Sequence, residues 1–160
     1  MLEQEIASAI KFILDSADNP APYYYEVSQD FIVPAVYFPQ PEIDSRGDTL
    51  LTYALEYSWF IKFFHKDAQS AQALAFAALT AIQFQRNRIP LIDEDGKLTG
   101  RSFLVKDPLL KSISDAAQLT LMWDSARPYY NKEYPVVQMF NASLYTKSAF
   151  DKAVSQIDDD

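Results

Sequence analysis

The longest regular pattern in the chain is an alternation of apolar and polar residues between Leu51 and His65. The apolar residues of this run share one parity: Leu51, Tyr53, Leu55, Tyr57, Trp59, Ile61 and Phe63. Because side chains alternate across a strand, the run predicts a β-strand with one buried face. A second alternating run, from Ser112 to Asp124, predicts another long strand. Asp115 interrupts its apolar parity, which suggests a bulge or a position near the rim of the sheet.

Helical spacing appears on either side of the first run. Apolar residues recur every three to four positions over 2–16, which predicts an amphipathic helix that ends at Asp18-Asn19-Pro20. Asp67 stands where a helix N-cap belongs, just before the alanine-rich segment 68–86, so a second helix is expected there. A short amphipathic helix is also predicted over 146–157.

The remaining segments read as shorter strands. Residues 23–27 and 31–38 are strand candidates, and Pro34 and Pro39 predict that the second lies at a sheet edge. The dipeptide Asp95-Gly96 predicts a hairpin within 91–105. The resulting order α-β-β-β-α-β-β-β-α predicts a single α+β domain over 1–160, with a mostly antiparallel sheet and helices packed on one face. Residues 127–160 are a candidate C-terminal extension of that domain.

The predicted long strands are too long for a domain of this size. Fifteen residues at ~3.3 Å each span about 50 Å, whereas a compact domain of 160 residues has a diameter of roughly 40 Å. The strands must therefore bend, break at a bulge, or project. A projecting ribbon would expose an apolar stripe that a partner would cover, and the alternative is a twisted, bulged strand within a monomer.

Composition and charge exclude several classes of function. The net charge is −8, acids outnumber bases 22 to 14, and the bases are scattered. This disfavours nucleic-acid binding and adhesion to anionic membranes, which need clustered Lys and Arg. The chain has no cysteine and one histidine, which excludes thiol chemistry and the usual zinc sites. The acidic N-terminus is unlike a signal peptide and no window is long enough to span a membrane, so no membrane partner is expected.

Candidate chemical sites all have plainer structural interpretations. His65 is expected at a strand end next to the Asp67 cap, without a placed nucleophile or orienting carboxylate. The triplet Asp93-Glu94-Asp95 is expected to form a turn, and the pair Glu42 and Asp44 to lie in a solvated loop. No catalytic residue, metal ligand or cofactor is therefore predicted.

The order of these elements resembles a known family. The features that carry the resemblance are the N-terminal helix, the proline-framed strand Val33–Phe38, the aromatic strand 51–65, the alanine-rich helix starting at Asp67, and a final long strand ending Trp123-Asp124. Together they cover about residues 2–126 and are similar to tail-terminator and tail-completion proteins of long-tailed phages and prophages. The resemblance rests on element order and pattern rather than on a catalytic motif.

The resemblance implies a minor structural protein of the virion rather than an enzyme. Such a protein forms a homo-oligomeric ring, commonly a hexamer, that caps the tail tube and offers a surface to the head connector. It would assemble in the cytoplasm of the bacterial host and end in the virion tail. We expect the contacts on the polar parity of the first long strand and at the tip of the predicted hairpin: Thr52, Glu56, Ser58, Phe60 and Lys62, and Asp93, Glu94, Asp95 and Lys97.

Two other functions stay open at this point. One is a different head–tail completion or minor capsid protein of similar fold. The other is a small-molecule-binding or enzymatic α+β domain, in which Tyr23–Tyr25, Tyr57 and Trp59 would form an aromatic cup. A concave apolar pocket with convergent polar groups would favour the latter.

Overall fold

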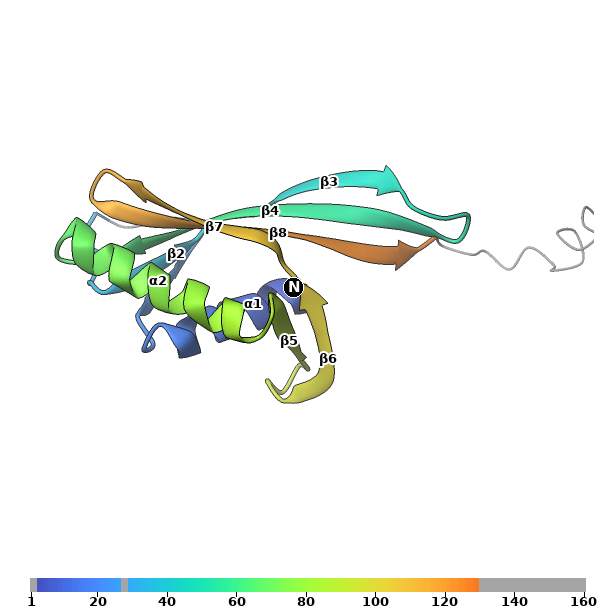
Figure 1. Cartoon of the computed structure of the whole chain (residues 1–160), viewed down its shortest axis with the longest axis horizontal. Helices are drawn as coiled ribbons and strands as arrows, with labels where there is room; N and C mark the ends of the chain where they lie inside the picture. Colours follow the sequence, from blue (N-terminus) through green and yellow to red (C-terminus); the bar gives the residue numbers. More distant parts are fainter. Residues whose placement is uncertain (1–2, 27–28, 130–160) are drawn as a thin grey trace, which may run out of the picture. The chain divides into compact units, whose positions relative to one another are not determined.

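The computed structural model describes residues 3–26 and 29–129, and within them the chain forms a mostly antiparallel sheet with two helices (Figure 1). The elements in chain order are α1 (Gln4–Ser16), β1 (Ala21–Tyr24), β2 (Ala35–Phe38), β3 (Glu42–Gly47), β4 (Thr52–Phe64), α2 (Ala68–Phe84), β5 (Arg88–Ile92), β6 (Leu98–Leu104), β7 (Lys106–Ile113) and β8 (Ala116–Pro128). The predicted α+β class is confirmed. The elements up to Arg127 belong to one compact unit, and the helix predicted over 146–157 lies outside the described residues.

The main sheet has the strand order β1-β2-β4-β8-β7, with β3 pairing to β4 off this path. Two strands pair with the same edge of β4, one after the other. Its C-terminal end, Lys62–Phe64, pairs with β2, whereas Tyr53–Ser58 pairs with β3, both antiparallel. β1 pairs parallel to β2, and β5 and β6 form a separate two-stranded sheet.

Both helices pack on one face of the main sheet (Figure 1). The predicted apolar parity of β4 points toward them: Tyr57, Trp59, Ile61 and Phe63 are all at most 1% exposed. The residues of α2 that face the core are Ala71, Ala75, Ala78 and Ile82. Small side chains at three of these positions let the helix backbone approach the sheet closely, which explains why an alanine-rich segment covers an aromatic strand.

The centre of the core is aromatic. The ring of Trp123 on β8 stacks on Tyr57 with centroids 4.6 Å apart, and it also contacts Trp59 and Phe103. The Trp59 indole N–H donates to the Pro39 carbonyl at 2.6 Å. Because Phe103 lies near the end of β6, these ring contacts join β4 and β8 of the main sheet to the β5–β6 sheet.

The long strands project as well as pack. β3 and the hairpin that joins it to β4 extend past the two helices (Figure 1). We call β3, residues 52–58 of β4 and residues 123–127 of β8 the ribbon; its inner side packs in the core through Tyr57 and Trp123 and bonds Glu5 of α1 through Ser125 and Arg127. Exposure rises at its tip, where Leu50 is 95% and Leu51 62% exposed. Of the outcomes expected from strand length, projection is the one observed for β4.

Two predictions about strands are wrong. The strand predicted over 31–38 is shorter and is not at an edge, because β2 lies between β1 and β4. Pro34 and Pro39 flank β2 instead of interrupting it, and the Pro34 carbonyl accepts a hydrogen bond from the Ala21 amide at 3.0 Å. Because the two prolines lie outside β2, their lack of an N–H group removes no hydrogen bond between β2 and the strands on either side of it.

The run Ser112–Asp124 is likewise not one strand. Ser112 and Ile113 end β7, Ser114 and Asp115 form a turn, and β8 begins at Ala116, which pairs with Ile113. Ser114 has φ +49°, a left-handed conformation common in two-residue hairpin turns. Asp115 therefore breaks the parity because the chain reverses there, not because the strand bulges.

Candidate interaction surface

His65 and Asp67 both serve local structure at the junction between β4 and α2. The His65 Nδ1 accepts a hydrogen bond from the Lys66 amide at 2.8 Å. The Asp67 carboxylate accepts from the Ser70 amide at 2.7 Å and from the Ser70 hydroxyl at 3.0 Å. These bonds lower the pKa of Asp67, because they favour its charged form. The predicted cap of α2 is confirmed.

The acidic triplet forms the turn of the β5–β6 hairpin. One carboxylate oxygen of Asp93 accepts from the amides of Asp95, at 3.0 Å, and Lys97, at 2.8 Å. Gly96 has φ +77°, which suits a residue without a Cβ. Across residues 3–26 and 29–129 no group of three or more His, Asp or Glu side chains is placed to hold a metal ion.

The same described residues contain no helix long and apolar enough to cross a membrane.

The predicted contact residues fall on two separate surfaces. Those of the hairpin tip, Asp93, Glu94, Asp95 and Lys97, are exposed, and the hairpin is fastened to α1 through hydrogen bonds of Ile92 with Gln4 and Ser8. It therefore lies on the helix side of the main sheet (Figure 1). The contact residues of β4 point the other way, so no single surface contains both groups.

The β4 group lies on the face of the main sheet that faces away from the helices, which we call the outer face. Its predicted members are Thr52, Glu56, Ser58, Phe60 and Lys62, all half-buried. Pairing registers place Arg46 of β3, Met122 of β8, and Lys106, Leu109, Lys111 and Ile113 of β7 on the same side. Neither described helix covers this face (Figure 1).

An ion-pair network crosses the outer side of the ribbon. Arg46 binds Glu56 and also Asp124, at 3.3 Å, and Lys106 binds Asp124 at 2.5 Å. The bond to Glu56 is the main cause of the raised pKa of Arg46. Because these groups are exposed, the network adds little to folding stability. Its two bases and two acids balance each other, while Glu42 and Asp44 of β3 add negative charge on the same side.

Apolar side chains are also exposed on the outer face, on β7 and β8. Leu109 is 46%, Ile113 41% and Met122 37% exposed. Lys111 lies between Leu109 and Ile113 on β7, and Lys106 pairs with Met122. An apolar patch beside polar and charged residues is typical of protein–protein contact sites. Sequence reasoning missed the β7 members, because a register shift between Lys106 and Leu109 breaks the alternation that would have marked them.

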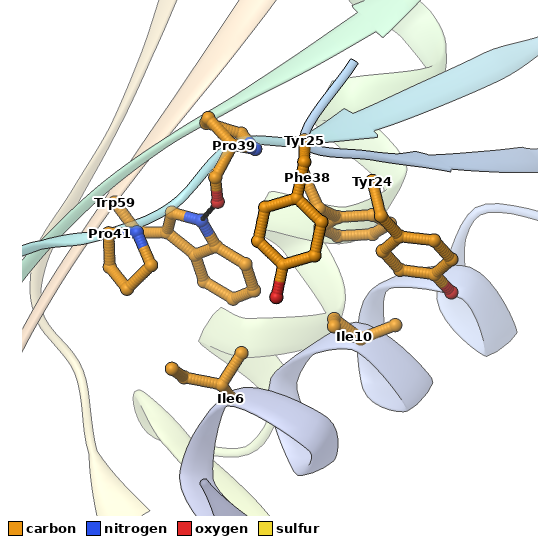
Figure 2. Close-up of a pocket in the computed structure, with 8 residues that line it drawn as sticks. All are labelled: Ile6, Ile10, Tyr24, Tyr25, Phe38, Pro39, Pro41 and Trp59. Carbon is orange, nitrogen blue, oxygen red and sulfur yellow. Dashed lines mark hydrogen bonds between the residues drawn. The ribbon is translucent and has the colours of Figure 1, made fainter. Parts of the chain in front are cut away.

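The aromatic cup forms only in part. Tyr24, Tyr25, Phe38 and Trp59 line a pocket with Ile6, Ile10, Pro39 and Pro41 (Figure 2). Two predicted members lie elsewhere: the Tyr23 hydroxyl accepts from the Ile32 amide, and Tyr57 stacks on Trp123 in the core. The pocket has a volume of about 40 Å³, far below the several hundred Å³ usual for ligand sites. Its one indole N–H is already bonded to Pro39 (Figure 2).

The chain is thus an α+β domain with exposed apolar side chains on its outer face and only a small aromatic pocket. No protein-family model matches the chain. It is 31% identical over 139 residues to the phage-like element PBSX protein XkdJ of Bacillus subtilis (strain 168), covering 86% of this chain and 94% of that protein. It is 33% identical over 111 residues to the uncharacterized protein YqbJ of the same organism, covering 69% and 76% of the two chains.

The chain belongs to the family of XkdJ. Among solved structures, a chain from the virion of a native gene transfer agent particle is similar, with a TM-score of 0.46 and 15% identity, covering 77% of this chain and 92% of that one.

Proposed function

We propose that this protein is a structural assembly protein of a phage-type particle, and specifically a tail terminator. Copies would form a ring that caps the finished tail tube and joins it to the head connector. The observation that carries the proposal is family membership: a relative that matches nearly its whole length belongs to a phage-like element. Assembly would take place in the host cytoplasm, and the protein would remain in the finished particle.

The surface of the domain supports a role in binding other proteins. The outer face exposes the apolar side chains Leu109, Ile113 and Met122 between Lys106 and Lys111, and the tip of the ribbon extends beyond the helices (Figure 1). We propose the outer face as the contact surface for other proteins of the particle, with the hairpin tip as a second contact region. A different head–tail completion or minor capsid protein would use the same features, so the partner decides between these functions.

Ligand binding is the less favoured function. The aromatic pocket holds about 40 Å³, room for little more than ordered water. Its lining is almost wholly apolar, and the polar groups that would orient a substrate do not converge there.

The test is the solution mass by light scattering over a concentration series, with and without a candidate tail-tube protein. We expect a concentration-dependent rise toward a ring, or a ring that appears on addition of the tube protein. A strict monomer that ignores tube and connector proteins would refute the proposal. A ring that binds a capsid or connector protein but not a tube would favour the head–tail completion alternative.

A further inference from the structure

The ribbon has two sheet edges that no described strand occupies. β7 pairs with β8 only as far as Met122, opposite Lys106, so residues 123–127 of β8 continue beyond it. On the other side, β3 pairs with β4 through Glu42–Gly47 and has no further neighbour in the sheet order of the described strands. The ribbon is therefore a three-stranded sheet, β3-β4-β8, with one open edge on each side.

Open edges of this kind are recognition elements. Each presents a row of backbone N–H and C=O groups, which a further strand can pair with. Proteins usually protect such edges by a covering element, a bulge or very short strands. Here six consecutive residues of β3 are exposed. The start of α1 does contact the β8 part of the ribbon, where Glu5 bonds Ser125 and Arg127, but these bonds use side chains and not the backbone groups of the strand.

The two edges match each other in length and direction. The β3 edge has six residues, and the β8 edge runs over 123–127. β3 and β8 point the same way, since each runs opposite to β4 (Figure 1). If β3 of one copy lay beside β8 of the next, the sheet would continue from copy to copy by parallel pairing.

We propose that copies of this protein join head to tail through these edges, β3 of one copy pairing with residues 123–127 of β8 in the next. Pairing β3 with β3, or β8 with β8, would leave the other edge of every copy open. Head-to-tail pairing occupies both edges in every copy, and such a heterologous contact closes into a ring when its rotation allows. The inference rests on the proposed ring and identifies the surfaces that build it.

The test uses the absence of cysteine in the natural chain. Asp44 on β3 and Ala126 on β8 are both exposed and lie on the outer side of the ribbon. Within one copy β4 separates them, so their Cα atoms are roughly 10 Å apart across two strand spacings. A disulfide needs Cα atoms within about 7 Å, so a bond between these positions can form only between copies.

The double variant Asp44→Cys/Ala126→Cys should give a ladder of cross-linked species on a non-reducing gel after mild oxidation. A mixture of the two single variants should give mainly the mixed dimer. Glu42→Cys/Ala126→Cys covers a shift of register by two residues. The matched control is Gln69→Cys/Ala126→Cys, because Gln69 is exposed on α2, far from the β3 edge; it should not form a ladder.

The outcomes separate the two proposals. A ring seen by light scattering without cross-links in either β3–β8 pair would overturn the edge inference and leave the tail-terminator proposal standing. Dimers of a single variant in excess of the mixed dimer would also overturn it, in favour of like-with-like pairing. If the protein stays monomeric in the presence of each tube, connector and capsid protein tested, both the proposed function and the edge inference are refuted.

Discussion

Comparing the two tryptophans isolates the contribution of one buried hydrogen bond to stability, because their surroundings are otherwise similar. Trp59 is 1% and Trp123 0% exposed, and both belong to the same ring cluster. The indole N–H of Trp59 donates to the Pro39 carbonyl at 2.6 Å, whereas that of Trp123 has no hydrogen-bond partner among the described residues. Replacing each by phenylalanine removes a similar apolar area but a different amount of hydrogen bonding.

The magnitude follows from that difference. A net hydrogen bond contributes about 0.5–1.5 kcal/mol to stability, and an acceptor left buried without a partner costs about 1–3 kcal/mol. Trp123→Phe loses neither, because its N–H is already unpaired. We therefore expect Trp59→Phe to lower the free energy of unfolding by about 1–2 kcal/mol more than Trp123→Phe does.

Urea unfolding followed by far-UV circular dichroism measures this difference. With a slope of about 2 kcal/mol per M, the midpoint of Trp59→Phe should lie roughly 0.5–1 M below that of Trp123→Phe. Phe84→Ala is the control, since Phe84 is 82% exposed and its truncation should change stability by less than about 0.5 kcal/mol. Equal midpoints for the two tryptophan variants, or a lower one for Trp123→Phe, would refute the reasoning.

Three further predictions concern the helices and the core. Asp67→Ala should destabilise the fold by about 1 kcal/mol in thermal or urea unfolding, and Asp67→Asn by much less, because asparagine can still cap. Ala75→Leu should cost about 1–3 kcal/mol by overpacking α2 against the sheet, while the exposed Ala73→Leu should be near neutral; similar effects at both positions would contradict the packing. Burial, together with the hydrogen bond to Glu3, raises the pKa of Tyr57 to about 12. Tyr57 therefore contributes stability that is present below about pH 10 and lost as pH rises toward about 12; between pH 9 and 11, urea unfolding should show natural protein losing about 1 kcal/mol more than Tyr57→Phe.

The elements with a strong local signal could be predicted from the sequence. β4 was predicted within one residue at each end, because its uninterrupted period-two pattern spans both the covered part and the ribbon. α2 was predicted with its cap, since Asp67 directly precedes a long run of helix-forming residues. The β5–β6 hairpin was predicted from Asp95-Gly96, whose turn geometry is local and needs no tertiary information.

The elements that depend on neighbours could not be predicted. β3 was missed because all six of its residues are exposed, so neither face carries an apolar pattern. The place of β2 inside the sheet depends on β1, a four-residue strand that pairs with it in parallel and carries no signal of that choice. Ser114 and Asp115 were read within a continuous strand, because the apolar parity resumes after the turn.

The candidate surfaces were predicted to a similar extent. The polar parity of β4 correctly indicated a side of the sheet that is not packed in the core, so Phe60 and Lys62 were placed on the outer face. The apolar patch beside them could not be read from that strand alone, since Leu109 and Met122 come from strands brought together by the fold. Whether the predicted residues make contacts stays a prediction.

The outer face and the ribbon edges lead to separate expectations, because pairing at a sheet edge uses backbone groups in the plane of the sheet and leaves its faces free. Met122→Lys places a charge in the apolar patch at a position already 37% exposed, so the fold should tolerate it. It should weaken binding to a tube or connector protein at least tenfold, measured by calorimetry or light scattering. The cross-linked ladder of Asp44→Cys/Ala126→Cys should persist in the same background. Phe84→Lys, on the exposed side of α2, controls for the general loss of apolar surface. If Met122→Lys abolished the ladder and left partner binding unchanged, the outer face rather than the ribbon edges would join the copies. Partner binding would then have to be assigned to another surface.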